Sequence, residues 1–235
     1  MISSKIPQRC LKYLIALVGL GTSCAGFAQT PPSAAQITQY EGIFRAVVER
    51  NGTQLTREIR LSENIDKRDS YTRSALHIAT YFANHDAMRK LVAAGADANA
   101  LEYDYYDIVT IAAVADDLAT MKLALQLGCR PGNVTSRYEG TALIAAAHLG
   151  HVEIVNTLIE AGAPLDHVNN LDWTAMIESI VLGDGGARHA ETLRLLVAAG
   201  AEMNLADRAG RTPLTLAQQM GYAEMVEILR KAGAE

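Results

Sequence analysis

Five segments of this chain repeat one pattern at a spacing near 33 residues. They open at Ser74, Asp107, Thr141, Thr174 and Thr212, at intervals of 33, 34, 33 and 38 residues. A glycine followed by a small residue stands 21 residues after four of the openings, at 95–96, 128–129, 162–163 and 233–234. In the fourth segment this pair stands at 200–201, because five extra residues lie within 182–188. A fixed period of this length indicates a repeat architecture.

The spacing within one segment predicts a pair of short helices. Ser, Asp and Thr at the openings are good helix N-caps, because their side-chain oxygen accepts a hydrogen bond from an unpaired backbone N–H. A helix of about eight residues then fits before a turn such as Gly150-His151, and a second helix follows over 152–161. Gly162 ends that helix, since glycine tolerates the left-handed backbone of a helix C-terminus. Two such helices bury their apolar faces only by stacking on neighbouring pairs, which gives a solenoid.

These repeats resemble ankyrin repeats. The resemblance rests on openings such as Thr212-Pro213-Leu214 and Ser74-Ala75-Leu76-His77, on the Gly150-His151 turn and on the ending over 95–99. It implies an all-α solenoid of stacked helix–turn–helix units with short β-turn or hairpin loops. The five repeats lie at about 66–98, 99–132, 133–165, 166–203 and 204–235. The second departs most, with Asp116-Asp117 at the turn and Gly132 where the others have Asn or Asp.

Residues 35–65 hold a degenerate first unit that caps the stack. At the same register Ile43, Ala46 and Val47 fall where a first helix packs, and Asn51-Gly52 marks the turn. Leu55, Ile59 and Leu61 supply the second helix. Terminal repeats are atypical because one of their faces meets water. The ankyrin-repeat domain therefore spans 35–235.

The first 28 residues have the features of a secretory signal peptide. Lys5, Arg9 and Lys12 precede an apolar run over 13–20, and small residues lead to Ala28. We predict cleavage after Ala28, a flexible lead-in over 29–34 and a periplasmic or secreted protein. The apolar run is shorter than the roughly 20 residues of a spanning helix, so no membrane span is expected after cleavage. A lipoprotein joined through Cys24 is disfavoured, because Gly21 replaces the usual branched aliphatic residue.

The sequence favours neither catalysis nor a cofactor. The formal net charge of −5, or −8 after residues 1–28 are removed, gives no support to nucleic-acid binding. Metalloprotease, Cys-x-x-Cys, nucleophile-elbow and phosphate-loop motifs are missing from the sequence. His77, at the fourth position of an opening, is expected to bond the first-position hydroxyl and the backbone, as ankyrin histidines do. His148 and His151 have metal-ligand spacing, but no Cys or carboxylate completes a site, and Cys129 replaces a packed alanine.

The resemblance implies that a partner docks on a concave face built from loop tips and the exposed side of each first helix. The tyrosines concentrate there, with six of nine between residues 71 and 138, and aromatic side chains are enriched at binding hot spots. The predicted contact residues are those before the openings (Arg73, Tyr106, Trp173, Arg211), exposed first-helix positions (Tyr81, Phe82, His148, Glu178) and loop tips (Tyr103, Tyr138).

The leading hypothesis is a monomeric, non-enzymatic periplasmic scaffold that binds another protein. One alternative is an immunity-type inhibitor that blocks an exported toxic enzyme. A second is an accessory factor in periplasmic oxidative-stress defence, which requires a metal or a reactive thiol. Fold alone does not name the partner, because ankyrin repeats are a scaffold without chemistry of their own.

Overall fold

The computed structural model describes residues 29–235, so the predicted signal peptide lies outside the described residues. The described chain folds into 13 helices, α2 to α14, and contains no sheet. Its longest helix, α12, has 12 residues, and none between 29 and 235 is long and apolar enough to cross a membrane. The predicted all-α repeat solenoid is confirmed.

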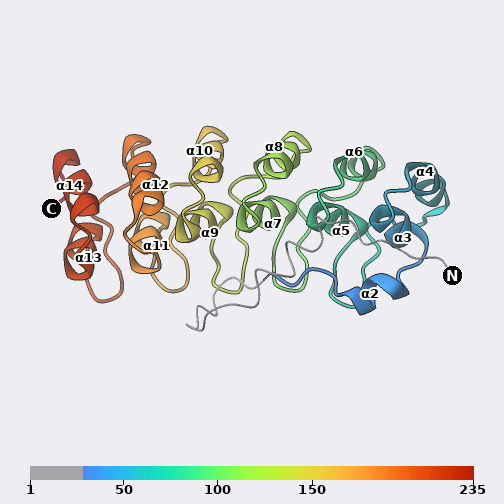
Figure 1. Cartoon of the computed structure of the whole chain (residues 1–235), viewed down its shortest axis with the longest axis horizontal. Coiled ribbons are helices and arrows are strands. Elements are labelled where there is room, and N and C mark those ends of the chain that lie inside the picture. The colour runs from blue at the N-terminus through green and yellow to red at the C-terminus, as the bar shows by residue number, and fades with distance from the viewer. Residues whose placement is uncertain (1–28) are drawn as a thin grey trace.

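After the short helix α2 (Ala34–Gln39), the helices alternate between two rows (Figure 1). The first helices of successive pairs form the lower row, from which the loops hang, and the second helices form the upper row. The lower row holds α3 (Gly42–Val48), α5 (Ala75–Tyr81), α7 (Ile108–Val114), α9 (Ala142–Leu149), α11 (Ala175–Val181) and α13 (Pro213–Met220). The upper row holds α4 (Gly52–Leu61), α6 (His85–Ala93), α8 (Leu118–Gln126), α10 (Val152–Glu160), α12 (Ala187–Ala198) and α14 (Ala223–Ala232).

The repeat openings act as the predicted N-caps. In each of the five, the side-chain oxygen accepts a hydrogen bond from the backbone N–H three residues later. These bonds satisfy one of the unpaired donors at each helix start and fix where the chain turns into the first helix. His77 makes the predicted contacts: its Nδ1 lies 2.8 Å from the Ser74 hydroxyl and its Nε2 lies 2.9 Å from the Ala100 carbonyl oxygen.

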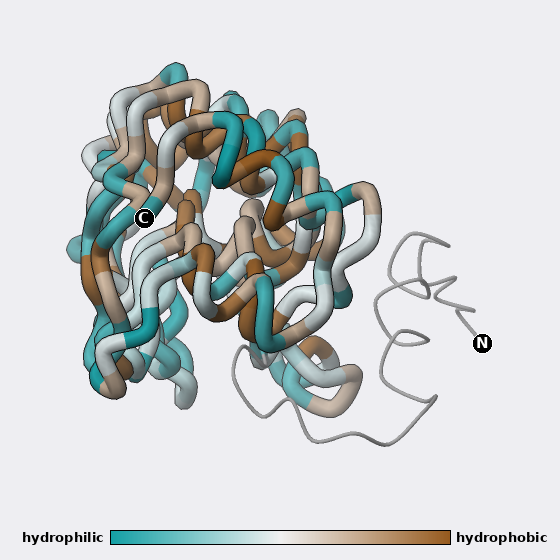
Figure 2. Tube along the Cα trace, turned by 90° about the vertical axis from the view of Figure 1, so that its left-hand side faces the viewer, coloured by the Kyte–Doolittle hydropathy of each residue, from teal (hydrophilic) through white to brown (hydrophobic). Residues whose placement is uncertain are grey.

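The core runs between and along the two rows. In α9, seven of the eight residues are buried, and Ala145, Ala146 and Ala147 are at most 1% exposed. Side chains this small let neighbouring first helices pack closely on both sides. The end-on view in Figure 2 shows the hydrophobic stretches gathered towards the middle, with hydrophilic residues mostly on the outer turns. The buried residues form one continuous cluster from Tyr40 to Leu229.

Residues 35–65 contribute the helix pair α3 and α4. Ala46, Val47 and Leu55 are at most 1% exposed and belong to the common core. Leu61 ends α4 but is 67% exposed, so it does not contribute to packing. The helix α2 precedes this unit and begins with a capping box between Ser33 and Gln36.

Side chains at the repeat junctions form a second regular set of hydrogen bonds. Asp66, Asn99, Asp166 and Asn204 each accept from a backbone N–H that lies 31 to 36 residues later, just after the next Gly–small pair. The second repeat has Gly132 at this position. The corresponding backbone donor would be residue 164, but this is a proline, which has no N–H. A methyl group on Gly132 would lie 3.0 Å from the Pro164 Cδ. An acceptor side chain at position 132 would therefore have no N–H to bind, and glycine leaves room for the proline ring.

The insertion in the fourth repeat is divided between a turn and a helix. The N-caps of its two helices, Thr174 and Gly186, are two residues further apart than Thr141 and His151 in the third repeat. The helix α12 takes the other three residues, since α6, α8 and α10 have nine residues each. The longer turn is tied to the fifth repeat, because the Tyr222 hydroxyl donates to the Gly183 carbonyl oxygen at 3.0 Å.

Candidate protein-binding surface

The five hairpin loops that precede the first helices share one hydrogen-bonding pattern. The side chain five residues before each opening accepts from two backbone N–H groups, two and four residues further on, at 2.8–3.4 Å. These loop acceptors are Asp69, Glu102, Ser136, Asn169 and Asp207. Because one oxygen serves two N–H groups, each loop is closed by its own sequence. We call the loops, together with α5, α7, α9, α11 and α13, the concave face.

The loop tips are also fixed by backbone conformation and by their neighbours. The residue two before each opening has a positive φ: Thr72 (53°), Tyr105 (63°), Glu139 (55°), Asp172 (62°) and Gly210 (74°). Backbone hydrogen bonds join neighbouring loops, from Tyr103 to Tyr71, from Ser136 to Tyr105 and from Asn170 to Tyr138. A partner would therefore meet loops that are already ordered, which lowers the entropic cost of binding.

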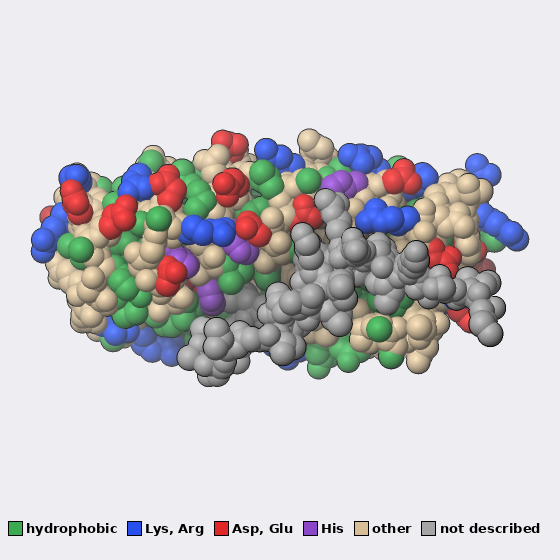
Figure 3. Space-filling model, viewed as in Figure 1, with side chains coloured by type: hydrophobic (Ala, Val, Ile, Leu, Met, Phe, Trp, Pro, Cys, Tyr) green, Lys and Arg blue, Asp and Glu red, His purple; other side chains and the backbone are tan. Residues whose placement is uncertain are grey.

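Exposed apolar side chains gather on these loops. Of the eight large hydrophobic residues exposed within 29–235, six lie on them: Tyr71, Tyr103, Tyr105, Val134, Val168 and Leu171. The other two, Leu61 and Met220, lie at helix ends. Along the face shown in Figure 3, acidic and basic side chains alternate, so charge of one sign does not mark a site there. The clustering of apolar residues on loops is therefore the stronger indication of an interface.

Two of these tyrosines lie in a row with arginines. The Tyr71 and Tyr103 rings meet edge to face, with centroids 6.1 Å apart. The Arg73 guanidinium lies 4.8 Å from the Tyr71 centroid, and the Arg137 guanidinium lies 5.0 Å from the Tyr103 centroid. Arg137 also pairs with Asp104 at 3.3 Å. We call Tyr71, Tyr103, Arg73 and Arg137 the tyrosine–arginine row; it joins the first three loops of the concave face.

The predicted contact residues differ widely in exposure. Tyr103 is 53% exposed, and five others are half-buried: Tyr81, Phe82, Tyr138, Trp173 and Arg211. Arg73, Tyr106, His148 and Glu178 are buried, with exposed fractions of 0%, 3%, 8% and 1%. The expectation that His148 and Glu178 are exposed first-helix positions is therefore wrong. These four residues shape the surface from below, and the sequence did not reveal this.

The buried side chain of Arg73 closes its own loop. Its Nε donates to the Asp69 carboxylate at 2.8 Å, and a second guanidinium nitrogen lies 2.7 Å from the same oxygen. At the other end of the stack, Arg211 pairs with Asp207 in the same way, at 2.8 and 2.6 Å. An arginine immediately before an opening thus reinforces an aspartate acceptor five residues before that opening.

Glu178 supports the fourth loop from the helix beneath it. Its Oε1 accepts from the Asn169 side-chain amide at 2.7 Å, while the Asn169 oxygen holds the loop backbone. Its Oε2 lies 3.5 Å from His148 Nδ1 on the neighbouring first helix. Burial raises the pKa of the Glu178 carboxyl. We therefore assign this group to loop positioning.

A second buried acid lies beneath the second loop. Glu102 uses Oε1 as the loop acceptor, but its Oε2 is buried and makes no hydrogen bond within the described chain. The Tyr81 hydroxyl is likewise buried and without a hydrogen bond there. Burial raises the pKa of Glu102 to about 7, with Asp104 adding to the rise and Arg73 opposing it. Burial also raises the pKa of Tyr81.

Tyr105, like Tyr71, is an exposed loop tyrosine that the predicted contact residues leave out. It is 52% exposed, whereas its neighbour Tyr106 is buried. The left-handed backbone at Tyr105 turns its side chain outward, and Tyr106 immediately precedes the N-cap Asp107, where the chain enters the core. The sequence signal that could have found this is the polar residue five before each opening, which defines the loop and hence its tip.

The histidines and the cysteine within 29–235 do not form a reactive centre. That part of the chain holds no group of three His, Cys, Asp or Glu that could bind a metal ion. Cys129 is 3% exposed, as predicted for a packed small residue, and its thiol lies 3.4 Å from the Asp107 carboxylate. Burial raises the pKa of this thiol, which keeps it in the unreactive protonated form.

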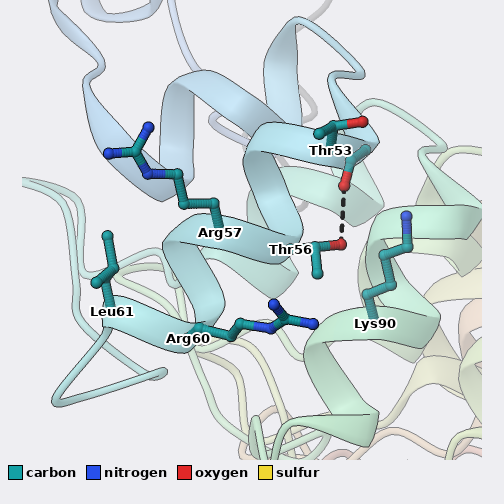
Figure 4. Close-up of a pocket in the computed structure, with 7 residues that line it drawn as sticks. Thr53, Thr56, Arg57, Arg60, Leu61 and Lys90 are labelled. Atoms are coloured by element: carbon teal, nitrogen blue, oxygen red, sulfur yellow. Dashed lines mark hydrogen bonds between the residues drawn. The ribbon is translucent and has the colours of Figure 1, made fainter.

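An open groove of about 790 Å³ lies between α4 and α6, on the side of the second helices (Figure 4). Arg57, Arg60 and Lys90 line it, with the hydroxyls of Thr53 and Thr56. Lys90 is already paired with Asp86 at 2.8 Å, and the Thr56 hydroxyl donates to the Gly52 carbonyl oxygen at 2.9 Å. Lys90 and the Thr56 hydroxyl are thus already engaged by their neighbours, and we assign no ligand to the groove.

Comparison with known proteins finds the same architecture. A family model of three ankyrin repeats matches residues 109–207, and the single ankyrin-repeat model matches 72–103 and 209–235. The chain is 31% identical to the ankyrin repeat protein YahD of Escherichia coli (strain K12) over 176 residues, which cover 74% of this chain and 87% of YahD.

Two solved structures are also similar. An ankyrin repeat domain from Acinetobacter baumannii AYE is 39% identical, with a TM-score of 0.75, over 82% of this chain and 98% of that one. The ankyrin repeat protein EF0377 is 27% identical, with a TM-score of 0.74, over 83% of this chain and all of that one.

Proposed function

The chain belongs to the ankyrin-repeat family, and we propose that it is a non-enzymatic scaffold that binds another protein on its concave face. Domains of this family generally mediate protein–protein interaction. The observation that carries the proposal is the set of exposed apolar side chains on loops that are already closed by their own hydrogen bonds.

The contact residues of this proposal are Tyr71, Tyr103, Tyr105 and Leu171, with Tyr138, Trp173 and Arg211 at their margin. Tyrosine offers a large contact area for only two side-chain torsions, so it binds at low entropic cost. The arginines of the tyrosine–arginine row sit over ring faces, which orients those rings before a partner arrives.

The proposal places the working protein in the periplasm as a monomer. Its support is the composition of residues 1–28, with three basic residues, a short apolar run and small residues up to Ala28. An exported chain cut after Ala28 keeps Cys129 as its single thiol. Since that thiol is buried, the oxidative-defence alternative would need chemistry supplied by the partner.

The proposal is tested by affinity capture from periplasmic extract, followed by calorimetry with the protein that is captured. The bait is recovered from the same compartment, and its first residue is read by mass spectrometry, with Gln29 expected. A Tyr71→Ala/Tyr103→Ala/Tyr105→Asn variant removes the exposed rings while asparagine tolerates the left-handed backbone at position 105. We expect this variant to bind at least about tenfold more weakly.

A matched control separates a specific surface from general stickiness. Leu61→Ala removes an exposed apolar side chain at the end of α4, outside the concave face, and the affinity of this variant should stay within about twofold of the unsubstituted protein. Equal weakening by both variants would refute the assignment of the concave face. An enzyme assay of the captured partner then distinguishes a scaffold, which leaves the activity intact, from an immunity-type inhibitor, which abolishes it.

A further inference from the structure

The segment before α2 lies against the concave face and does not extend away from it. In Figure 1 the blue trace that leads into α2 passes along the loops below α5 and α7. Three hydrogen bonds join Gln29 and Thr30 to residues 43 to 82 positions later in the chain. Pro32 is buried and Pro31 is exposed. These contacts distinguish residues 29–33 from the flexible lead-in that the sequence predicts.

The three hydrogen bonds pair each donor or acceptor of Gln29 and Thr30 with a specific group on the concave face. The Gln29 side-chain amide donates to the Ile111 carbonyl oxygen in α7 at 2.7 Å. The Thr30 hydroxyl donates to the Asp104 carboxylate at 2.9 Å, and the Thr30 carbonyl oxygen accepts from Arg73 at 2.9 Å. Asp104 lies on a loop tip, and Arg73 lies just before the opening of α5. The segment therefore bridges two loops and a first helix.

The chain just after α2 is anchored by Tyr40. Its hydroxyl donates to the Asp69 carboxylate at 2.7 Å and lies 3.3 Å from an Arg73 nitrogen. Its ring stacks on Phe44 of α3, with centroids 5.4 Å apart. Within residues 29–33, Pro31 and Pro32 fix their own φ and restrict the residue before each of them to extended backbone. A segment that is already restricted in this way loses less entropy on docking.

We propose that residues 29–33 are an intramolecular ligand of the concave face, and that they occupy the surface over α5 and α7 where a partner would otherwise dock. A partner then binds the exposed loop tips alone or displaces the segment to reach the first helices beneath it. The concave face binds three groups of this extended segment: the Thr30 hydroxyl, the Thr30 main-chain carbonyl and the Gln29 carboxamide. This inference goes beyond the proposed function and holds whether or not a partner is captured.

Backbone ¹⁵N relaxation of the full chain, in the form recovered from cells, tests the proposal. A docked segment gives Thr30 and Ser33 order parameters near the rigid value of about 0.85, whereas a free tail gives values below about 0.6. Thr30→Val removes the hydroxyl at nearly constant shape, and Asp104→Ala removes its acceptor. We expect either change to lower the order parameter of residue 30 clearly, and the double variant to lower it no further, because both remove the same bond.

The control is Arg137→Ala, which removes the ion-pair partner of Asp104 and leaves the Thr30 hydrogen bond untouched. It should leave the order parameter of Thr30 unchanged. The proposal is overturned if Thr30 is as mobile as a free tail in the unsubstituted protein. It is equally overturned if Arg137→Ala mobilises the segment as much as Asp104→Ala does, since the hydroxyl–carboxylate bond would then not hold it.

Discussion

At the scale of the residue, Glu102 combines a structural role with an unfavourable burial. One carboxylate oxygen closes the second loop, while the other is buried and makes no hydrogen bond within residues 29–235. Burial raises the pKa of Glu102 to about 7. The Glu102 carboxylate also interacts electrostatically with its neighbours Arg73, Asp104, Tyr81 and Tyr106. A group whose folded pKa exceeds its unfolded value binds more protons in the folded state.

Glu102 should therefore lower the stability of the protein as the pH rises from about 4.5 to about 7, the range between its unfolded and folded pKa values. His77 acts in the opposite direction, because burial lowers its pKa to about 4, so a comparison with a Glu102 variant is needed to isolate this contribution. Glu102→Gln keeps the loop acceptor oxygen but carries no charge, so it removes this loss. Urea unfolding at pH 5 and pH 8 should show the variant gaining about 2 kcal/mol on the unsubstituted protein between the two conditions. Glu139→Gln, at an exposed loop position, should show no such gain; equal gains would contradict the assignment to Glu102.

At the scale of the element, the inserted turn of the fourth repeat depends on glycine for two separate reasons. Gly185 has a φ of 68°, and a methyl group there would overlap the Tyr222 ring of the next repeat. Gly210 has a similar φ of 74°, but a methyl group there would have nothing within 4 Å. Comparing the two positions separates the cost of the backbone conformation from the cost of the contact.

Gly210→Ala should cost about 1–2 kcal/mol of stability, the penalty for a left-handed backbone with a side chain. Gly185→Ala should cost at least about 1 kcal/mol more, because the Tyr222 ring must also move and lose its hydrogen bond to Gly183. Denaturant midpoints of the two variants provide the measurement. If the two substitutions cost the same, the inserted turn and Tyr222 are not packed together as described.

The helices and their order could be predicted from local sequence signals, whereas the contact residues could not. Helix starts at Thr141 and Thr174 and the helix end at Gly162 were predictable, because capping depends on residues close in sequence. The burial of Arg73 depends on Asp69 and on Tyr40 from another unit, and the exposure of Tyr105 depends on a positive φ. Long-range partners and tip conformation leave no periodic trace, so the contact residues were predicted only in part.

At the scale of the whole molecule, the main helix contacts within residues 29–235 join helices of the same or the adjacent repeat. The first helices contact one another in chain order, and so do most of the second helices. Stability in such a stack is a sum of repeat terms and nearest-neighbour interfaces. An interior repeat is held on two sides, whereas the last repeat, α13 and α14, is held on one.

Truncating either of two equally buried leucines should therefore destabilise different parts of the stack. Leu143 in α9 and Leu229 in α14 are both fully buried, and truncating either to alanine costs about 2–5 kcal/mol. Hydrogen exchange should show Leu229→Ala losing protection in α13 and α14 only, while Leu143→Ala loses it in the repeats on both sides as well. A uniform loss across 75–232 in both variants would show that the stack unfolds as one unit.

The acceptor side chain in each loop separates the positions proposed to contact a partner from the residues that keep the loop folded. Between each acceptor and the residue before the opening lie three positions, 70–72, 103–105, 137–139, 170–172 and 208–210, and none of these fifteen residues is buried. Substitutions there can rewrite specificity, provided that the left-handed residue is tolerated, while the residues that close each loop stay unchanged. Natural variation or laboratory selection could thus redirect this surface to a new target without rebuilding the helices beneath it.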